Sequence, residues 1–91
     1  MAIGRAERRA SRRTKVAVLF ADRTDRALDL LELLELAWHD VYGDVTPPEE
    51  VIDDVLTVSQ GTLRGLIRAA RLAVADHRDL RLQAAAIRSE L

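Results

Sequence analysis

The stretch that decides the fold is residues 24–42, which read TDRALDLLELLELAWHDVY. Alternating steps of four and three residues, the spacing of one buried face of an α-helix, separate the apolar positions Ala27, Leu31, Leu34, Trp38 and Val41. Further apolar side chains widen this face, namely Leu28, Leu30, Leu33, Leu36 and Ala37. We therefore expect a helix from Thr24 to Tyr42 that is packed from two directions, by its own chain and by a second subunit.

Toward the N-terminus, the same apolar phase continues from Ile3 through Ala10 and Ala17 to Phe20. One continuous helix over residues 5–42 is consistent with this pattern. A break near Asp22–Asp25 is equally consistent, because Asp22 or Thr24 is a favourable N-cap residue. The sequence leaves both alternatives open.

On the other side, Thr46-Pro-Pro-Glu49 resembles the start of a helix. Thr46 suits the N-cap, Pro47 suits the first helical position, and Glu49 completes a capping box. Apolar and acidic residues then fall on opposite faces up to Val58 or Ser59. We expect a second, shorter amphipathic helix here.

The last predicted helix runs from Thr62 to Ser89, and its apolar positions alternate steps of three and four to the end of the chain. Its 28 residues would reach about 42 Å. If it ran back beside the shorter helix, residues 79–91 would overhang with an apolar seam of Leu80, Ala84, Ile87 and Leu91. Either the N-terminal helix or a second subunit would have to cover that seam.

Composition limits the remaining choices. Residues 1–91 are short enough for a single helical domain, and 48% hydrophobic residues argue against disorder. The chain has no cysteine, and its longest apolar run, Val16–Ala21, is too short to span a bilayer. We expect an all-α fold, a bundle of three or four helices with a long C-terminal helix, that forms a dimer in the cytoplasm and does not enter a membrane.

The charges are sorted along the chain. Residues 1–21, the basic N-terminal arm or helix, carry six bases and one acid, residues 22–60 carry eleven acids and two bases, and residues 61–91 carry six bases and three acids. The arm lies on the acidic middle of its own or a neighbouring chain, or it contacts phosphates of a nucleic acid or an acidic membrane surface. We favour the first role, because the acidic partner is already in the sequence.

Residues 50–71 offer a DNA-binding alternative. Their core, VSQGTLRGLIR from Val58 to Arg68, resembles the turn and recognition helix of bacterial helix-turn-helix regulators. This resemblance implies burial of Ile52, Leu56, Val58, Leu63 and Leu66. It implies candidate nucleic-acid contacts at Gln60, Thr62, Arg64 and Arg68, assisted by Arg8, Arg9, Arg12 and Arg13 of the arm.

Two features depart from that family. Thr57 stands at the turn position usually held by glycine, and Asp53 stands where a small residue is usual. The first helix also carries carboxylates where it would cross the phosphate backbone, which opposes the main term in DNA affinity.

Catalytic and metal sites are weakly indicated. His39-Asp40 and Asp76-His77 lack the i, i+4 spacing of ligands that share a helix. Arg71 and His77 have the spacing seen in HEPN ribonucleases, a resemblance that implies action on a scissile phosphate. No nucleophile triad and no phosphate-binding glycine loop is present in the sequence. We therefore expect no enzyme activity, no catalytic residue, no metal site, no cofactor and no small-molecule ligand.

The leading hypothesis is a non-enzymatic helical module for protein–protein interaction or oligomerisation. Its partner is a second copy of the chain, or else another helical protein. The predicted core and dimer seam comprises Leu31, Leu34, Trp38, Leu80, Ala84, Ile87 and Leu91. A helix-turn-helix-like DNA-binding regulator is the alternative, and a HEPN-like ribonuclease is a more distant one.

Overall fold

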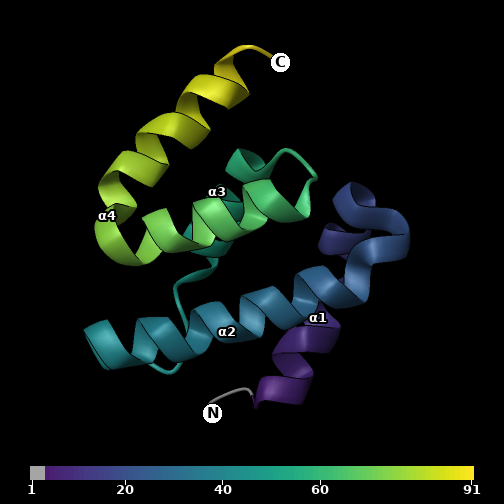
Figure 1. Ribbon diagram of the computed structural model, residues 1–91, viewed down its shortest axis with the longest axis vertical. Coiled ribbons are helices and arrows are strands. Elements are labelled where there is room, and N and C mark those ends of the chain that lie inside the picture. Colours follow the sequence, from purple (N-terminus) through teal and green to yellow (C-terminus); the bar gives the residue numbers. More distant parts are fainter. Residues whose placement is uncertain (1–3) are drawn as a thin grey trace.

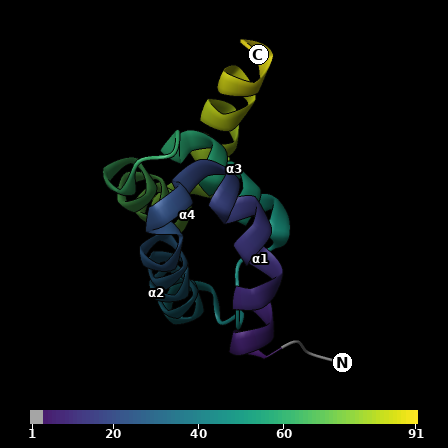
Figure 2. The same cartoon turned by 90° about the vertical axis from the view of Figure 1, so that its right-hand side faces the viewer.

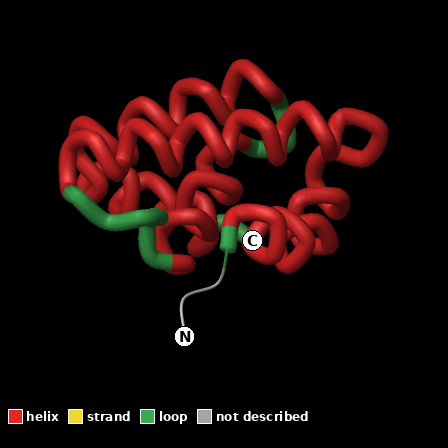
Figure 3. The backbone as a smooth tube through the Cα atoms, turned by 90° about the horizontal axis from the view of Figure 1, so that it is seen from below, coloured by secondary structure: helices red, strands yellow, loops and turns green. Residues whose placement is uncertain are grey.

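The computed structural model describes residues 4–91, and within this range the chain is all-α, with no strand. The helices of this range are α1 Arg5–Phe20, α2 Thr24–Tyr42, α3 Glu49–Ser59 and α4 Leu63–Ser89 (Figure 1). A short 3₁₀ turn, η1 Ala21–Arg23, joins the first two, and the remaining connections are brief loops (Figure 3). The predicted all-α class and the bounds of the central helix are confirmed. None of these helices is both long enough and apolar enough to cross a membrane.

α1 and α2 are two separate helices and not one continuous helix over residues 5–42, which settles the question that the sequence left open. Ala21 adopts a left-handed φ of 48°, and the hydroxyl of Thr24 donates to its carbonyl at 2.6 Å. The reversal lays α1 against α2 (Figure 2). Neither Asp22 nor Thr24 caps α2, because its N-cap is Arg23, without a side-chain bond. Ile3, which began the predicted apolar phase, lies outside the described residues.

The predicted start of the third helix is wrong by two residues. α3 begins at Glu49 with Pro48 as its N-cap, and no side-chain hydrogen bond caps it. Thr46 and Glu49 instead accept hydrogen bonds from Arg12 of α1, at 3.0 Å and 3.2 Å. The Arg12 guanidinium therefore binds the two side chains, Thr46 and Glu49, that the predicted capping box requires.

The turn between α3 and α4 is tight. Gln60 and Gly61 both adopt left-handed φ values, 52° and 80°, and Thr62 caps α4 by accepting from the amide of Gly65 at 2.9 Å. A Cβ at Gly65 would collide with the carbonyl oxygen of Ser59. Only glycine at this position allows the end of α3 to approach the first turn of α4 so closely.

α4 is kinked at Asp76, whose backbone is extended (φ −161°, ψ 85°). The Asp76 carboxylate accepts from the amide of Asp79 at 3.1 Å and so caps the second half of the helix. Tyr42 donates its hydroxyl to the carbonyl of Val74, two residues before the break, at 2.8 Å. The two halves, residues 63–75 and 77–89, therefore run in different directions (Figure 1).

The kink overturns the predicted overhang. The second half of α4 returns across α3, where Arg81 pairs with Glu50 and Arg88 with Asp54, both at 2.8 Å. Leu80 and Ala84 are fully buried in this contact, whereas Leu91 is 99% exposed. The part of the C-terminal seam formed by Leu80 and Ala84 is thus covered by its own chain, whereas Leu91 is not.

The core draws on all the helices of the described range. Its buried members include Val16, Phe20, Leu28, Leu31, Leu34, Ile52, Val55, Leu66, Ala73 and Leu80. Of the predicted seam, Leu31, Leu34, Trp38, Leu80 and Ala84 are buried, and Ile87 is half-buried. Within one chain, these buried side chains pack against other helices of the described range.

Candidate functional site

The basic arm lies on the acidic middle of the chain. Arg9 pairs with Asp29 and Glu32, each at 2.8 Å, and Arg13 pairs with Asp25 at 2.9 Å. These are largely exposed pairs between α1 and α2, worth about 0–1 kcal/mol each. The predicted docking of the arm is therefore seen, and the side chains proposed as phosphate contacts are engaged with carboxylates.

A buried ionic cluster holds α1 in place. Glu35 is 4% exposed and accepts from Arg8 at 2.6 Å and 3.1 Å and from Arg12 at 2.9 Å. Burial raises the pKa of the Glu35 carboxyl, but hydrogen bonds from Arg8, Thr46 and Arg12 lower it by more, so the pKa lies below its ordinary value. The bond to Glu35 likewise raises the pKa of Arg8. The cluster is ionised in the folded protein at neutral pH.

Because of this cluster, the free energy of unfolding is expected to depend on pH in the acidic range. A carboxyl whose pKa is lowered by folding stabilises the fold above its ordinary pKa of 4.5, and this stabilisation is lost as the pH falls through the folded value. We expect the free energy of unfolding to fall below about pH 4.5, and to fall less steeply in Glu35→Gln. Urea unfolding from pH 7 to pH 3 measures both slopes, and equal slopes would remove Glu35 as the cause.

The carboxylates of α3 are also engaged, each by a base of α1 or α4. The ion pairs are Arg12–Glu49 at 3.2 Å, Lys15–Asp53 at 2.9 Å, Arg81–Glu50 at 2.8 Å and Arg88–Asp54 at 2.8 Å. The Asp54 side chain is only 3% exposed, so this pair lies at the edge of the core. The acidic residues of α3 therefore serve to attach the flanking helices.

The helix-turn-helix resemblance holds in part. Ile52, Leu56 and Leu66 are buried, as it implied, while Val58 and Leu63 are half-buried. The turn, however, falls at Gln60 and Gly61, because Thr57 still lies within α3 and donates its hydroxyl to the carbonyl of Asp53 at 2.9 Å. Gln60 therefore lies in the turn and not on a recognition helix, and Thr62 is used as a cap.

One group of bases on α4 has no ion-pair partner in the part of the chain that the structure describes. Arg64, Arg68 and Arg71 are exposed on the first half of α4, and none forms an ion pair with any residue between 4 and 91. Their spacing of four and three residues places them along one side of the helix. We refer to Arg64, Arg68 and Arg71 as the arginine row.

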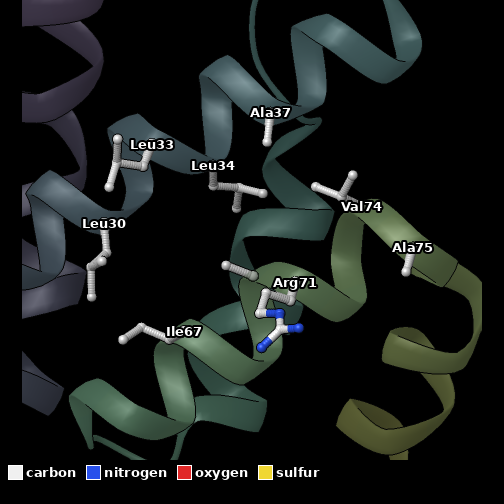
Figure 4. A pocket seen from close by; sticks show the side chains of 9 residues that line it. Leu30, Leu33, Leu34, Ala37, Ile67, Arg71, Val74 and Ala75 are labelled. Atoms are coloured by element: carbon white, nitrogen blue, oxygen red, sulfur yellow. The ribbon is translucent and has the colours of Figure 1, made fainter.

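An apolar groove of about 440 Å³ lies beside this row, between α2 and the first half of α4 (Figure 4). Its lining residues are Leu30, Leu33, Leu34, Ala37, Ile67, Ala70, Arg71, Val74 and Ala75. Leu33 is 59% exposed and Ile67 is 46% exposed, so both walls present large apolar side chains to solvent. Arg71 belongs to both the groove and the row, which makes the two features one continuous surface.

The sequence pattern indicates only part of this surface. Arg64 and Arg68 were expected as DNA contacts, and Arg71 as a ribonuclease residue. The available signal for the groove was the set of leucines that widen the apolar face of α2 beyond its buried side. Nothing in the sequence showed that Ile67 and Val74 would lie opposite them, because that depends on how α4 packs.

The histidines show no metal-site geometry. His39 lies 3.3 Å from the carbonyl of Asp44, while the ring of His77 lies 5.8 Å from Trp38 and 5.9 Å from Tyr42. Among residues 4–91, no group of three or more potential ligands is placed to hold a metal ion. His77 lines a depression with Arg78 and Arg81, and Arg71 lines the surface between α2 and α4.

Comparison with known proteins adds no assignment. No protein-family model matches the chain, and neither a curated protein nor a solved structure matches it.

Proposed function

We propose that this chain is a non-enzymatic helical-bundle module that forms a homodimer through the groove between α2 and α4. The observation that carries the proposal is the groove itself, an exposed depression whose lining is apolar except for Arg71. A hydrophobic groove is a surface in which a partner can lay the apolar face of an amphipathic helix. Two helices side by side form the usual receptor for a third amphipathic helix.

Self-association is favoured because α2 forms one wall of the groove and also carries an exposed apolar ridge that could enter the groove of a second copy. Leu33 lines the groove, and Leu36, which is 52% exposed, lies one turn further along the outer side of the same helix. A two-fold interface uses the same patch on both subunits, so that patch must be complementary to itself. A surface with an apolar groove next to an apolar ridge meets this requirement.

Replacing Leu33 with aspartate tests the proposal. The substitution places a charge where the partner would bury a leucine, and we expect dimerisation to weaken roughly 100-fold. Sedimentation equilibrium over a range of protein concentrations measures the dissociation constant. Circular dichroism checks that the exposed substitution leaves the helices intact.

Val18→Asp is the matched control. Val18 is 81% exposed on α1 and does not line the groove, so this variant is expected to dimerise like the wild-type chain. A wild-type chain that stays monomeric at high concentration contradicts the proposal. So does equal dimerisation of Leu33→Asp and the wild type.

A further inference from the structure

The arginine row lies next to the groove and pairs with no carboxylate of the described residues. Elsewhere on the chain, the acidic middle is matched by nearby bases, including Arg9, Arg13, Lys15 and Arg88. Arg64, Arg68 and Arg71 form no ion pair with residues 4–91, as is also true of Arg5, Arg23, Arg26 and Arg78. The three row residues differ because they lie on one side of a helix and line a shallow depression together with Ile67. A helix seated in the groove would run along this row, so its flank has to carry acidic residues.

The outer face of α2 has the required pattern. Asp29, Leu33, Leu36 and Asp40 follow one another at steps of four, three and four, which places them on one side of the helix. All four are exposed. An acidic residue thus stands at each end of a two-leucine ridge, over a length of about 16 Å. Asp29 already forms an ion pair with Arg9 of its own chain, whereas Asp40 forms no ion pair with residues 4–91.

We infer that the helix in the groove is α2 of a second copy, and that its Asp40 pairs with Arg64 and Arg68. This inference rests on the homodimer proposed above and adds the charged contacts that orient it. Because the arrangement is two-fold, the same contact forms twice, once on each side of the axis.

The geometry of the groove places Asp40 at the correct end. Leu30 and Ile67 lie at one end of the groove, and Ala37 and Val74 lie at the other (Figure 4). A two-fold axis between Leu33 and Leu36 makes the two α2 helices antiparallel. Position 40 of the second copy then lies near position 29 of the first, at the Leu30–Ile67 end. Arg64 and Arg68 lie three residues before and one residue after Ile67 on α4, and therefore also at the Leu30–Ile67 end of the groove.

The charged contacts act mainly on orientation and on salt dependence. Exposed ion pairs add little affinity, but like charges placed opposite one another disfavour the wrong pairing. This predicts a dimer that weakens with ionic strength, since exposed charges are screened over roughly 8–10 Å at physiological salt. The apolar groove supplies the larger part of the binding.

A charge swap tests the inference. Variant A carries Arg64→Glu and Arg68→Glu, and variant B carries Asp40→Arg. Each variant alone places like charges across the interface, and we expect each to dimerise at least about tenfold more weakly than wild type. Mixing A with B restores opposite charges at both ends of the interface. Their heterodimer is expected to approach wild-type affinity, measured by energy transfer between labelled A and labelled B.

Suitable controls keep the result interpretable. Arg23→Glu with Arg78→Glu makes the same change in net charge as variant A. Neither residue lines the groove or the row, so this control is expected to leave dimerisation unchanged. None of the residues changed in A or B forms an ion pair with residues 4–91, so their melting temperatures should stay close to that of wild type. A large loss of helix in either variant would show that these residues hold the fold and would overturn the inference.

The remaining outcomes separate this inference from the homodimer itself. If A and B dimerise as wild type while Leu33→Asp does not, the groove is the interface and the charged pairing is wrong. If Leu33→Asp also dimerises normally, the groove is not the dimer interface, and both the proposed function and this inference are wrong. If a short DNA duplex at low salt binds wild type and B but not A, and B dimerises normally, the row binds phosphates instead of Asp40.

Discussion

Replacing Glu35 with alanine is expected to lower the free energy of unfolding by about 3–5 kcal/mol, the usual cost of breaking a buried ion pair by removing one partner. Glu35 is 4% exposed, and Arg12 beside it is 3% exposed. Without Glu35, the remaining carboxylate partner of Arg12 among the described residues is Glu49, whose side chain is 55% exposed. Urea unfolding followed by circular dichroism measures the loss.

Asp29→Ala is the comparison variant. It removes an acid of the same helix whose pair with Arg9 is exposed, and we expect a loss of no more than about 1 kcal/mol. A double-mutant cycle isolates the buried pair, because Arg12→Ala should cost much less when Glu35 is already alanine. Similar losses for Glu35→Ala and Asp29→Ala would mean that the buried cluster does not hold α1.

Replacing Leu80 with alanine is expected to cost about 2–5 kcal/mol, because it opens a cavity between the second half of α4 and α3. Leu80 is fully buried and belongs to the main hydrophobic cluster. The loss is a large share of the roughly 5–15 kcal/mol that stabilises a typical domain. Chemical denaturation measures it, and the milder Leu80→Val keeps the test usable if the alanine variant fails to fold.

Leu82→Ala provides a control in the same half of α4. Leu82 is 70% exposed, so its truncation should change stability by less than about 0.5 kcal/mol. An overhanging C-terminal helix would instead make the two truncations equally mild in a monomer. The difference between them therefore measures whether the helix folds back on α3.

The local pattern of the central helix was sufficient to predict it. Residues 24–42 combine strong periodicity with Gly43, which closes the helix in a left-handed conformation at φ 82°. The start of α3 was mispredicted for a long-range reason: the side chains that suit a capping box were taken by Arg12, which is more than thirty residues away in the sequence. A propensity rule does not detect such competition.

The kink in α4 was not predictable from apolar spacing. Leu66, Ala73, Leu80 and Ala84 keep steps of seven and four across the break, and all four are buried. Neither glycine nor proline marks Asp76, and an aspartate in mid-helix is ordinarily a solvated surface residue. Its role as a second N-cap depends on the return of the chain across α3, which is a tertiary effect.

The candidate site was predictable only in its components. The surplus of leucines on α2 predicted packing from a second direction, and the charge blocks predicted that the arm would dock on acid. Which bases would remain unpaired could not be predicted, because Arg88 has a partner in α3 whereas Arg68 has none within residues 4–91. Pairing depends on the direction in which each half of α4 points.

The contacts of Arg12 have a consequence for the order of folding during synthesis. Its partners Glu35, Thr46 and Glu49 lie 23, 34 and 37 residues further along the chain. α1 leaves the ribosome before α2 and α3, so it has no complete binding site until the start of α3 has also emerged. Closing loops of this length costs entropy before the contacts form, which slows folding. Although α1 is made before α2 and α3, it is expected to dock only after α2 and the first turn of α3 are in place.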